Sequence, residues 1–192
     1  MLSRISRRAS ASLGLAATGV ALLVGPAVAS AAQSTGCPIA ADATVSQAVG
    51  SPLTGSVDGT SGSVIVCTFS DASSGRAFGV SRDAGAFGPA EGGAAALAQR
   101  YIPGLPDAAK SQIDALSQAG LNIALPDYQF EAVSGLGDSA LWVKSQLAPG
   151  YFKDSLLVQR GGDAFSFDVD DSPDARAALT SLAQAVLAQP SQ

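Results

Sequence analysis

The chain has 192 residues, among them 11 basic residues, 16 acidic residues and no histidine, and its formal net charge is −5. Beyond the first ten positions the basic residues stand singly, which disfavours the clustered positive charge that binds nucleic acid or anionic lipid. The absence of histidine removes the side chain that most readily acts as a general base near neutral pH.

The N-terminal segment has the three parts of a secretory signal peptide. Arg4, Arg7 and Arg8 supply positive charge, an apolar stretch follows at 13–24, and small residues come after Pro26. A membrane-spanning helix needs roughly 20 apolar residues, so this shorter stretch favours a cleaved signal over an anchor. The paired arginines leave the twin-arginine export route open beside the general one.

Cleavage is expected after Ala29, Ala31 or Ala32, so we assign residues 1–31 to the signal peptide. The remainder, 32–192, is long enough for a single domain. It keeps eight basic and 16 acidic residues, a net charge of −8. The sequence therefore predicts a secreted or otherwise extracytoplasmic domain with no membrane span, and no partnership with nucleic acid.

Cys37 and Cys67 are the only two cysteines. Two cysteines in an exported chain favour one disulfide bond. Lipidation of Cys37 is the alternative, but Ser34 stands where a lipidation motif carries a bulky apolar residue, and lipidation would leave Cys67 unpaired. A zinc site is excluded on ligand number.

The first half of the domain predicts short helices around a hairpin. In chain order the expected elements are a helix at 42–49 ended by Gly50, a strand fragment and loop at 51–62, strands at 64–69 and 76–82, and helices at 94–102 and 107–119. Ala109, Ile113 and Leu116 form the apolar stripe of the last helix.

The second half predicts four strands and a closing helix. The expected strands cover 128–132, 140–147, 152–160 and 165–170. In the last strand, Phe165, Phe167 and Val169 alternate with Ser166, Asp168 and Asp170, which predicts one buried face and one solvated face. Ser172 is expected to cap a helix at 173–189 that begins with Pro173.

Strands followed by helices occur twice, at 64–119 and at 128–189, which indicates a loose internal repeat. The expected fold class is α+β, an antiparallel sheet with helices packed on it.

An ordered set of short motifs spans most of residues 37–189: Cys37-Pro38, a helix ending at Gly50, Cys67-Thr68-Phe69, the run 135–140 before a strand with Trp142, and a closing helix rich in Ala and Leu. This set resembles small secreted proteins and lipoproteins of actinobacterial envelopes. The resemblance implies an α/β sandwich similar to PsbP-like domains, and no established chemistry. The chain departs from the lipoprotein members in lacking their lipidation motif.

The motif Gly135-Leu136-Gly137-Asp138 has the glycine spacing of a phosphate-binding loop. Such loops lead into a helix, whereas a strand is expected here, so a tight turn is the favoured interpretation.

The acidic residues near the C-terminus are the candidates for a weak cation site or a carboxylate pair. They are Asp163, Asp168, Asp170, Asp171 and Asp174. Asp168 and Asp170 should share the solvated face of their strand, roughly 6.5–7 Å apart, a separation that also suits a glycosidase. Solvated charge and a favourable helix start explain the cluster more simply, so we predict no metal, no cofactor and no catalytic residue.

Four aromatic residues are the candidates for a ligand groove: Tyr101, Tyr128, Trp142 and Tyr151. The leading hypothesis is a non-catalytic envelope or extracellular module that binds a protein or an apolar small molecule. The alternatives are a carboxylate-dependent hydrolase and a structural cell-surface or host-interaction protein.

Overall fold

The computed structural model describes residues 36–88, 91–102, 105, 107–119, 122–125 and 127–189; for 108, 114, 116–119 and 122–125 it describes the backbone alone. The predicted signal peptide and its cleavage site therefore lie outside the described residues. The elements in chain order are α1 (Asp42–Val49), β1 (Thr54–Ser61), β2 (Val64–Ser70), β3 (Ala77–Asp83), α2 (Ala94–Tyr101), α3 (Asp107–Ala119), β4 (Asn122–Leu125), β5 (Tyr128–Val133), β6 (Ser139–Ala148), β7 (Tyr151–Arg160), β8 (Asp163–Asp170) and α4 (Ala175–Leu187).

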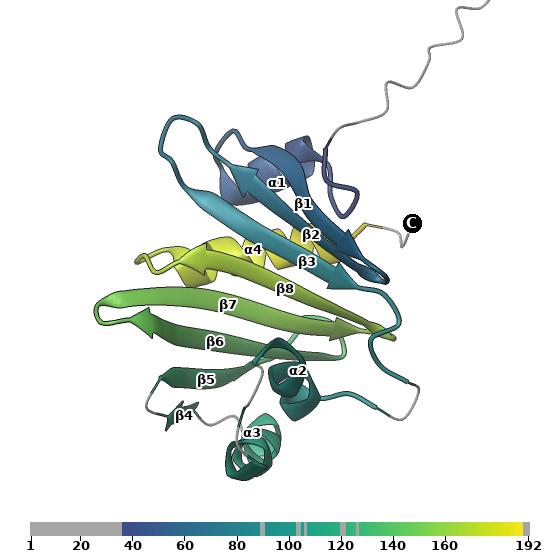
Figure 1. Cartoon of the computed structure of the whole chain (residues 1–192), viewed down its shortest axis with the longest axis vertical. Coiled ribbons are helices and arrows are strands. Elements are labelled where there is room, and N and C mark those ends of the chain that lie inside the picture. Colours follow the sequence, from purple (N-terminus) through teal and green to yellow (C-terminus); the bar gives the residue numbers. More distant parts are fainter. Residues whose placement is uncertain are drawn as a thin grey trace, which may run out of the picture. The chain divides into compact units, whose positions relative to one another are not determined.

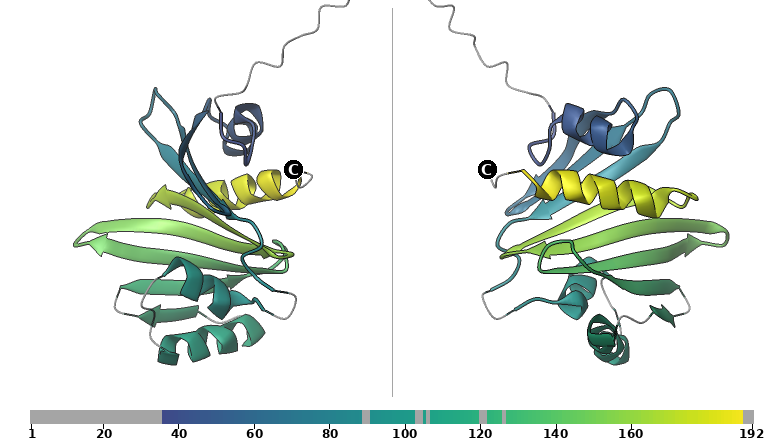
Figure 2. Two further views of the ribbon diagram at one scale, coloured as in Figure 1. Left: turned by 45° about the vertical axis from the view of Figure 1, so that its right-hand side comes forward. Right: turned by 180° about the vertical axis from the view of Figure 1, so that it is seen from behind.

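The eight strands form one antiparallel sheet in the order β1-β2-β3-β8-β7-β6-β5-β4 (Figure 1). The last strand of the chain, β8, thus lies in the middle of the sheet between β3 and β7. The predicted α+β class, with helices packed on an antiparallel sheet, is confirmed. The two strand-then-helix segments place their helices on opposite faces, which we call the α4 face and the α2 face (Figure 2).

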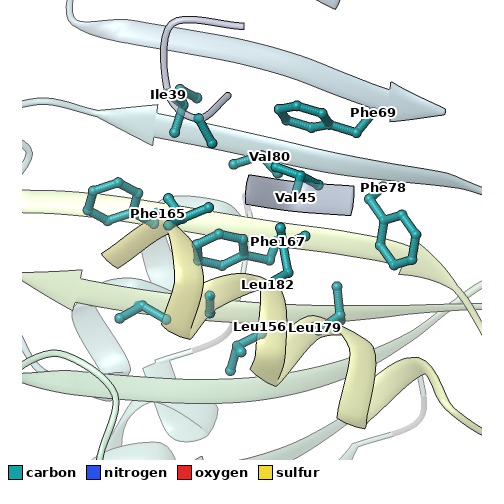
Figure 3. Close-up of a cluster of buried hydrophobic side chains, with 14 of the residues drawn as sticks. Ile39, Val45, Phe69, Phe78, Val80, Leu156, Phe165, Phe167, Leu179 and Leu182 are labelled. Atoms are coloured by element: carbon teal, nitrogen blue, oxygen red, sulfur yellow. The ribbon is translucent and has the colours of Figure 1, made fainter. Parts of the chain in front are cut away.

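The α4 face carries the larger part of the core. Helix α4 crosses β7 and β8 and packs beside α1. The predicted stripe of α4 is buried, with Leu179 and Leu182 fully enclosed against Phe167 and its neighbours (Figure 3). The helix begins at Ala175 rather than at Pro173, because the Ser172 hydroxyl donates to Asp174 and accepts from Arg76 instead of capping the helix.

The α2 face is covered at one end. Helix α2 packs on β6 and β7, and α3 packs on β4 and β5. Their contacts bury Leu97 and Ile113 against Phe130, Leu141 and Leu157 of the sheet. Where β3 and β8 cross the same face, the sheet presents the polar side chains of Ser81, Ser166 and Asp168.

The disulfide bond between Cys37 and Cys67 is present, with the two Cα atoms 5.8 Å apart. It ties the segment before α1 to β2. Both cysteines are buried in the core of the α4 face. The predicted pairing is confirmed.

Two strand predictions need correction. Within the segment 51–62, expected to be a strand fragment and loop, Thr54–Ser61 form an eight-residue edge strand, β1, because backbone pairing with β2 defines it although nearly all of its side chains are exposed. In β8, Phe165, Phe167 and Val169 do point into the core. The other face is solvated only in part: Asp170 is exposed and Asp168 is half-buried, as predicted, whereas Ser166 is only 4% exposed. Alternation identifies the residues that share a face, but it does not tell what covers that face.

The run 135–138 is a tight turn followed by β6, as the favoured interpretation predicted. Gly137 has a φ of +58°, and an added Cβ there would lie 2.1 Å from the carbonyl oxygen of Gln159. The backbone N–H of Asp138 donates to that same oxygen over 2.8 Å. Only glycine allows this close approach.

Candidate functional site

A cavity of about 300 Å³ lies on the α2 face, where β3, β8, β7 and β6 meet the C-terminal end of α2; we call it the α2 pocket. Its polar lining comes from Ser81, Ser145, Lys153, Ser155, Ser166 and Asp168. Its apolar lining comes from Val66, Tyr101, Ile102, Val143 and Leu157.

Asp168 is held in a fixed orientation at the floor of the pocket. The Ser155 hydroxyl donates to Oδ1 over 2.5 Å, and the Ser166 hydroxyl donates to Oδ2 over 2.9 Å. Ser155 is the cross-strand partner of Asp168, and Ser166 precedes it by two residues on the same face of β8. On the other side the partner is Gly79, where even a Cβ would lie 3.4 Å from the Cβ of Asp168. Strand register thus sets the position of this carboxylate.

Lys153 lies two residues before Ser155 on β7 and faces the same pocket. Its Nζ is 3.9 Å from Oδ1 of Asp168, which is close enough for an ion pair and too long for a hydrogen bond. Among the described residues its ammonium donates no hydrogen bond. All three of its donor positions are therefore available to another molecule or to water.

Tyr101 closes the pocket from the end of α2. Its hydroxyl is buried, lies near the Ser81 hydroxyl, and makes no hydrogen bond of normal geometry among the described residues. Burial raises the pKa of Tyr101 above its usual value, and the nearby Ser81 and Arg100 only partly oppose this shift. A buried hydroxyl without a partner is costly in a folded protein, so its presence beside a cavity marks a place where a polar group can bind.

Of the four aromatic residues predicted to line a groove, Tyr101, Tyr128 and Tyr151 lie on the α2 face, and only Tyr101 lines the α2 pocket; Trp142 lies on the other face. Tyr101 lines the α2 pocket, and Tyr128 stacks on Phe130 with ring centroids 5.9 Å apart. Tyr151 is 45% exposed and donates to Asp170 over 2.6 Å. Trp142 alternates with the α2-facing neighbours Leu141 and Val143, and it packs under Arg176 of α4 on the opposite face.

The acidic residues predicted as cation-site candidates are also separated. Asp163 pairs with Arg82, Asp171 with Lys144, and Asp174 with Arg76, at 2.8, 2.7 and 2.6 Å. The Lys144 ammonium lowers the pKa of Asp171, and the Arg76 guanidinium lowers that of Asp174. Asp168 and Asp170 remain on the α2 face, held by serine and tyrosine hydroxyls. Within the described part of the chain no three such residues gather around a position suited to a metal ion.

Asp154 is an unusual carboxylate that the sequence analysis missed. It is 2% exposed on the α4 face, and its Oδ1 has no hydrogen-bond partner in the described structure. Burial raises the pKa of Asp154 to about 6, the Lys144 ammonium opposes the shift, and Asp171 reinforces it. The sequence could have predicted this position. Asp154, Leu156 and Val158 are spaced two residues apart, so in a strand their side chains point to the same, apolar face.

A second cavity, of about 520 Å³, lies among loops near β7. Its two carboxylates already accept backbone N–H groups: Glu91 from Gly88, and Asp138 from Gly161. The Gln159 amide bonds to the backbone of the same loops. These contacts hold the loops together and explain the polar groups there.

Comparison with known proteins finds no matching family model, no matching curated protein and no matching solved structure. None of the helices described is long and apolar enough to cross a membrane.

Proposed function

We propose that the chain is exported and that its domain, residues 32–192, is a non-catalytic module of the cell envelope or extracellular space. Its ligand is a small molecule that binds in the α2 pocket. The pocket itself carries this proposal: a carboxylate, an ammonium and several hydroxyl groups converge on one cavity of about 300 Å³. Concave sites with a few converging polar groups are where proteins usually bind small molecules.

The lining favours a polar ligand over the apolar or protein partner expected from the sequence. An apolar ligand would remove water from Asp168 and Lys153, which are 22% and 38% exposed, and would give neither a new partner. Leaving such groups without a partner costs free energy. A polar ligand avoids that cost, and the apolar walls formed by Val143 and Leu157 exclude water around it.

Two observations support the proposed location. The N-terminal sequence has the parts of an export signal, and the disulfide between Cys37 and Cys67 is typical of an oxidising compartment. The resemblance to actinobacterial envelope proteins agrees with both and belongs to the same proposal.

The carboxylate whose pKa is shifted toward neutrality lies outside the α2 pocket, which favours binding over catalysis there. Catalysis at neutral pH uses a group whose pKa lies near that pH. Asp154, with its pKa raised to about 6, lies on the α4 face, away from the α2 pocket. In the pocket, burial moves the pKa of Tyr101 further from neutrality.

A pocket-filling variant tests the proposal. Ser145→Phe places a ring in the α2 pocket, and Gln129→Phe places the same ring at an exposed position on the other face. Native mass spectrometry and thermal-shift screening of small polar metabolites should show a bound ligand in the wild type and in Gln129→Phe, and none in Ser145→Phe. Ligand binding that Ser145→Phe leaves unchanged would contradict the proposal.

A carboxylate-dependent hydrolase is the alternative, and the pair Asp154 and Asp171 favours it. Their surroundings move the two pKa values in opposite directions, as in an acid–base pair. Lys144 stands against this interpretation because its ammonium already pairs with Asp171. A hydrolytic turnover that Asp154→Asn abolishes, with the fold intact, would establish the alternative.

A further inference from the structure

We infer that the α2 pocket takes a small zwitterion, a molecule whose ammonium and carboxylate are joined by a short carbon chain. Asp168 receives the ammonium and Lys153 receives the carboxylate. This inference rests on the proposed function and names the class of its ligand.

The first argument is the unused bonding capacity of the two charged groups. Each Asp168 oxygen accepts one serine hydroxyl, and a carboxylate oxygen has room for a second donor. The Lys153 ammonium donates no hydrogen bond among the described residues. Because the two groups are 3.9 Å apart, their own contact satisfies neither of them fully.

The second argument is charge balance. The described lining of the pocket holds one carboxylate and one ammonium, so its formal charge is zero. A ligand with a single charge would pair with only one of the two protein groups. It would leave the other group charged and without a partner in a partly desolvated site, which is unfavourable. A zwitterion is neutral overall and offers each protein charge an opposite one.

The third argument is the arrangement of the remaining lining. The buried Tyr101 hydroxyl, which makes no hydrogen bond of normal geometry among the described residues, can donate to a carboxylate held by Lys153. Val143 and Leu157 offer an apolar wall for a short aliphatic side chain. The volume, about 300 Å³, lies at the small end of ligand sites and suits a molecule of the size of an amino acid.

Isothermal titration calorimetry with three probes tests the inference on the exported, disulfide-bonded protein. L-leucine carries both charges, leucinamide carries only the ammonium, and N-acetyl-L-leucine carries only the carboxylate. L-leucine should bind, and each singly charged probe should bind at least about tenfold more weakly. Glycine, which lacks the side chain, should bind more weakly than L-leucine and still better than its own amide.

Two variants assign the ends of the ligand. Asp168→Asn should weaken leucinamide binding and strengthen N-acetyl-L-leucine binding, because it removes the carboxylate that this probe leaves without a partner; Lys153→Met should do the reverse. A variant that merely disturbed the fold would weaken both probes alike. The matched controls are Lys110→Met and Asp107→Asn, which remove an exposed ion pair on α3 and should change nothing.

The outcomes separate this inference from the proposed function. If neither L-leucine nor glycine binds and a neutral polyol such as glycerol or glucose does, the pocket is a binding site and the zwitterion inference is wrong. Equal affinity for the three leucine probes would also overturn it. If no small molecule binds the wild type, or if Ser145→Phe leaves the binding of a ligand unchanged, both the inference and the proposed function fail.

Discussion

The two faces of the same sheet differ in what their strands bury. On the α4 face, Phe165, Phe167 and Val169 of β8 are enclosed by α4 and α1. On the α2 face, the alternate residues Ser166 and Asp168 contact other polar groups and line a cavity. One strand thus contributes to the core on one side and to the candidate site on the other, so stability and binding should respond to different residues.

The largest effect expected is on the α4 face. Phe167 is fully buried, so Phe167→Ala should lower the free energy of unfolding by about 3–5 kcal/mol. Denaturant unfolding measures this change. Asp168→Asn, one residue away on the other face, should change the stability by less than about 1 kcal/mol. Similar losses in both variants would mean that the two faces are not energetically distinct.

The second-largest loss of stability is expected when the disulfide bond is removed. Cys37 and Cys67 enclose a loop with a sequence separation of 30 residues, and closing such a loop stabilises a fold by about 3–4 kcal/mol on the chain-entropy model. The double substitution Cys37→Ala and Cys67→Ala should therefore lower the unfolding midpoint in denaturant, with the wild type under reducing conditions as a comparison. A midpoint unchanged by either treatment would show that α1 and β2 hold the α4 face without the bond.

Substitution of Asp154 is expected to raise the free energy of unfolding, by less than the other two variants lower it. Folding raises the pKa of this carboxyl to about 6, so the folded state binds its proton more tightly than the unfolded state. The group therefore stabilises the fold below about pH 4, and this contribution is lost as the pH rises through 6. Asp154→Asn should be more stable than the wild type at pH 7, by up to about 3 kcal/mol.

The difference between the Asp154→Asn variant and the wild type should grow between about pH 4 and pH 6 and then stay constant. Thermal or denaturant unfolding at several pH values measures it. Lys144→Met is the informative companion, because removing the opposing ammonium should raise the pKa of Asp154 further. A difference that does not depend on pH would contradict the assignment of the perturbed group.

The smallest effect on stability should come from the pocket itself. Ser155→Ala removes one hydrogen bond to Asp168 and should cost about 1 kcal/mol or less, while weakening any ligand held by that carboxylate. In this variant the affinity for the ligand should therefore fall clearly, while the free energy of unfolding changes little. A large loss of stability would place Ser155 and Asp168 in the structural framework instead.

The sequence predicted the fold better than the site. Alternation in β8 and the stripe of α4 depend on neighbours within one element, so periodicity identified Phe167 and Leu182 as core residues. The α2 pocket depends on which strands pair and in which register. Ser155 meets Asp168 only because β7 and β8 align them, and Tyr101 reaches the same place from a helix far away in sequence.

The groove of four aromatic residues shows the same limit. The four residues were chosen because they are aromatic, without asking to which face of the sheet each side chain points. Alternation along the strands places Trp142 on the face opposite Tyr128. Asp154 shows the converse case. The face to which its side chain points was readable from Leu156 and Val158, and a carboxylate on an apolar face is the pattern that predicts a perturbed pKa.

In this molecule the α2 face is proposed to bind the ligand, and the α4 face to hold the fold together. Two-dimensional ¹H–¹⁵N NMR of the labelled protein, titrated with L-leucine, tests this division most directly because each backbone amide reports its own surroundings. Shifts are expected at the amides of four residues around the α2 pocket, Ser81, Ser155, Ser166 and Asp168, whereas Leu179 and Leu182 of α4 should be unchanged. Shifts centred on α4, or around Asp154 and Lys144, would contradict it.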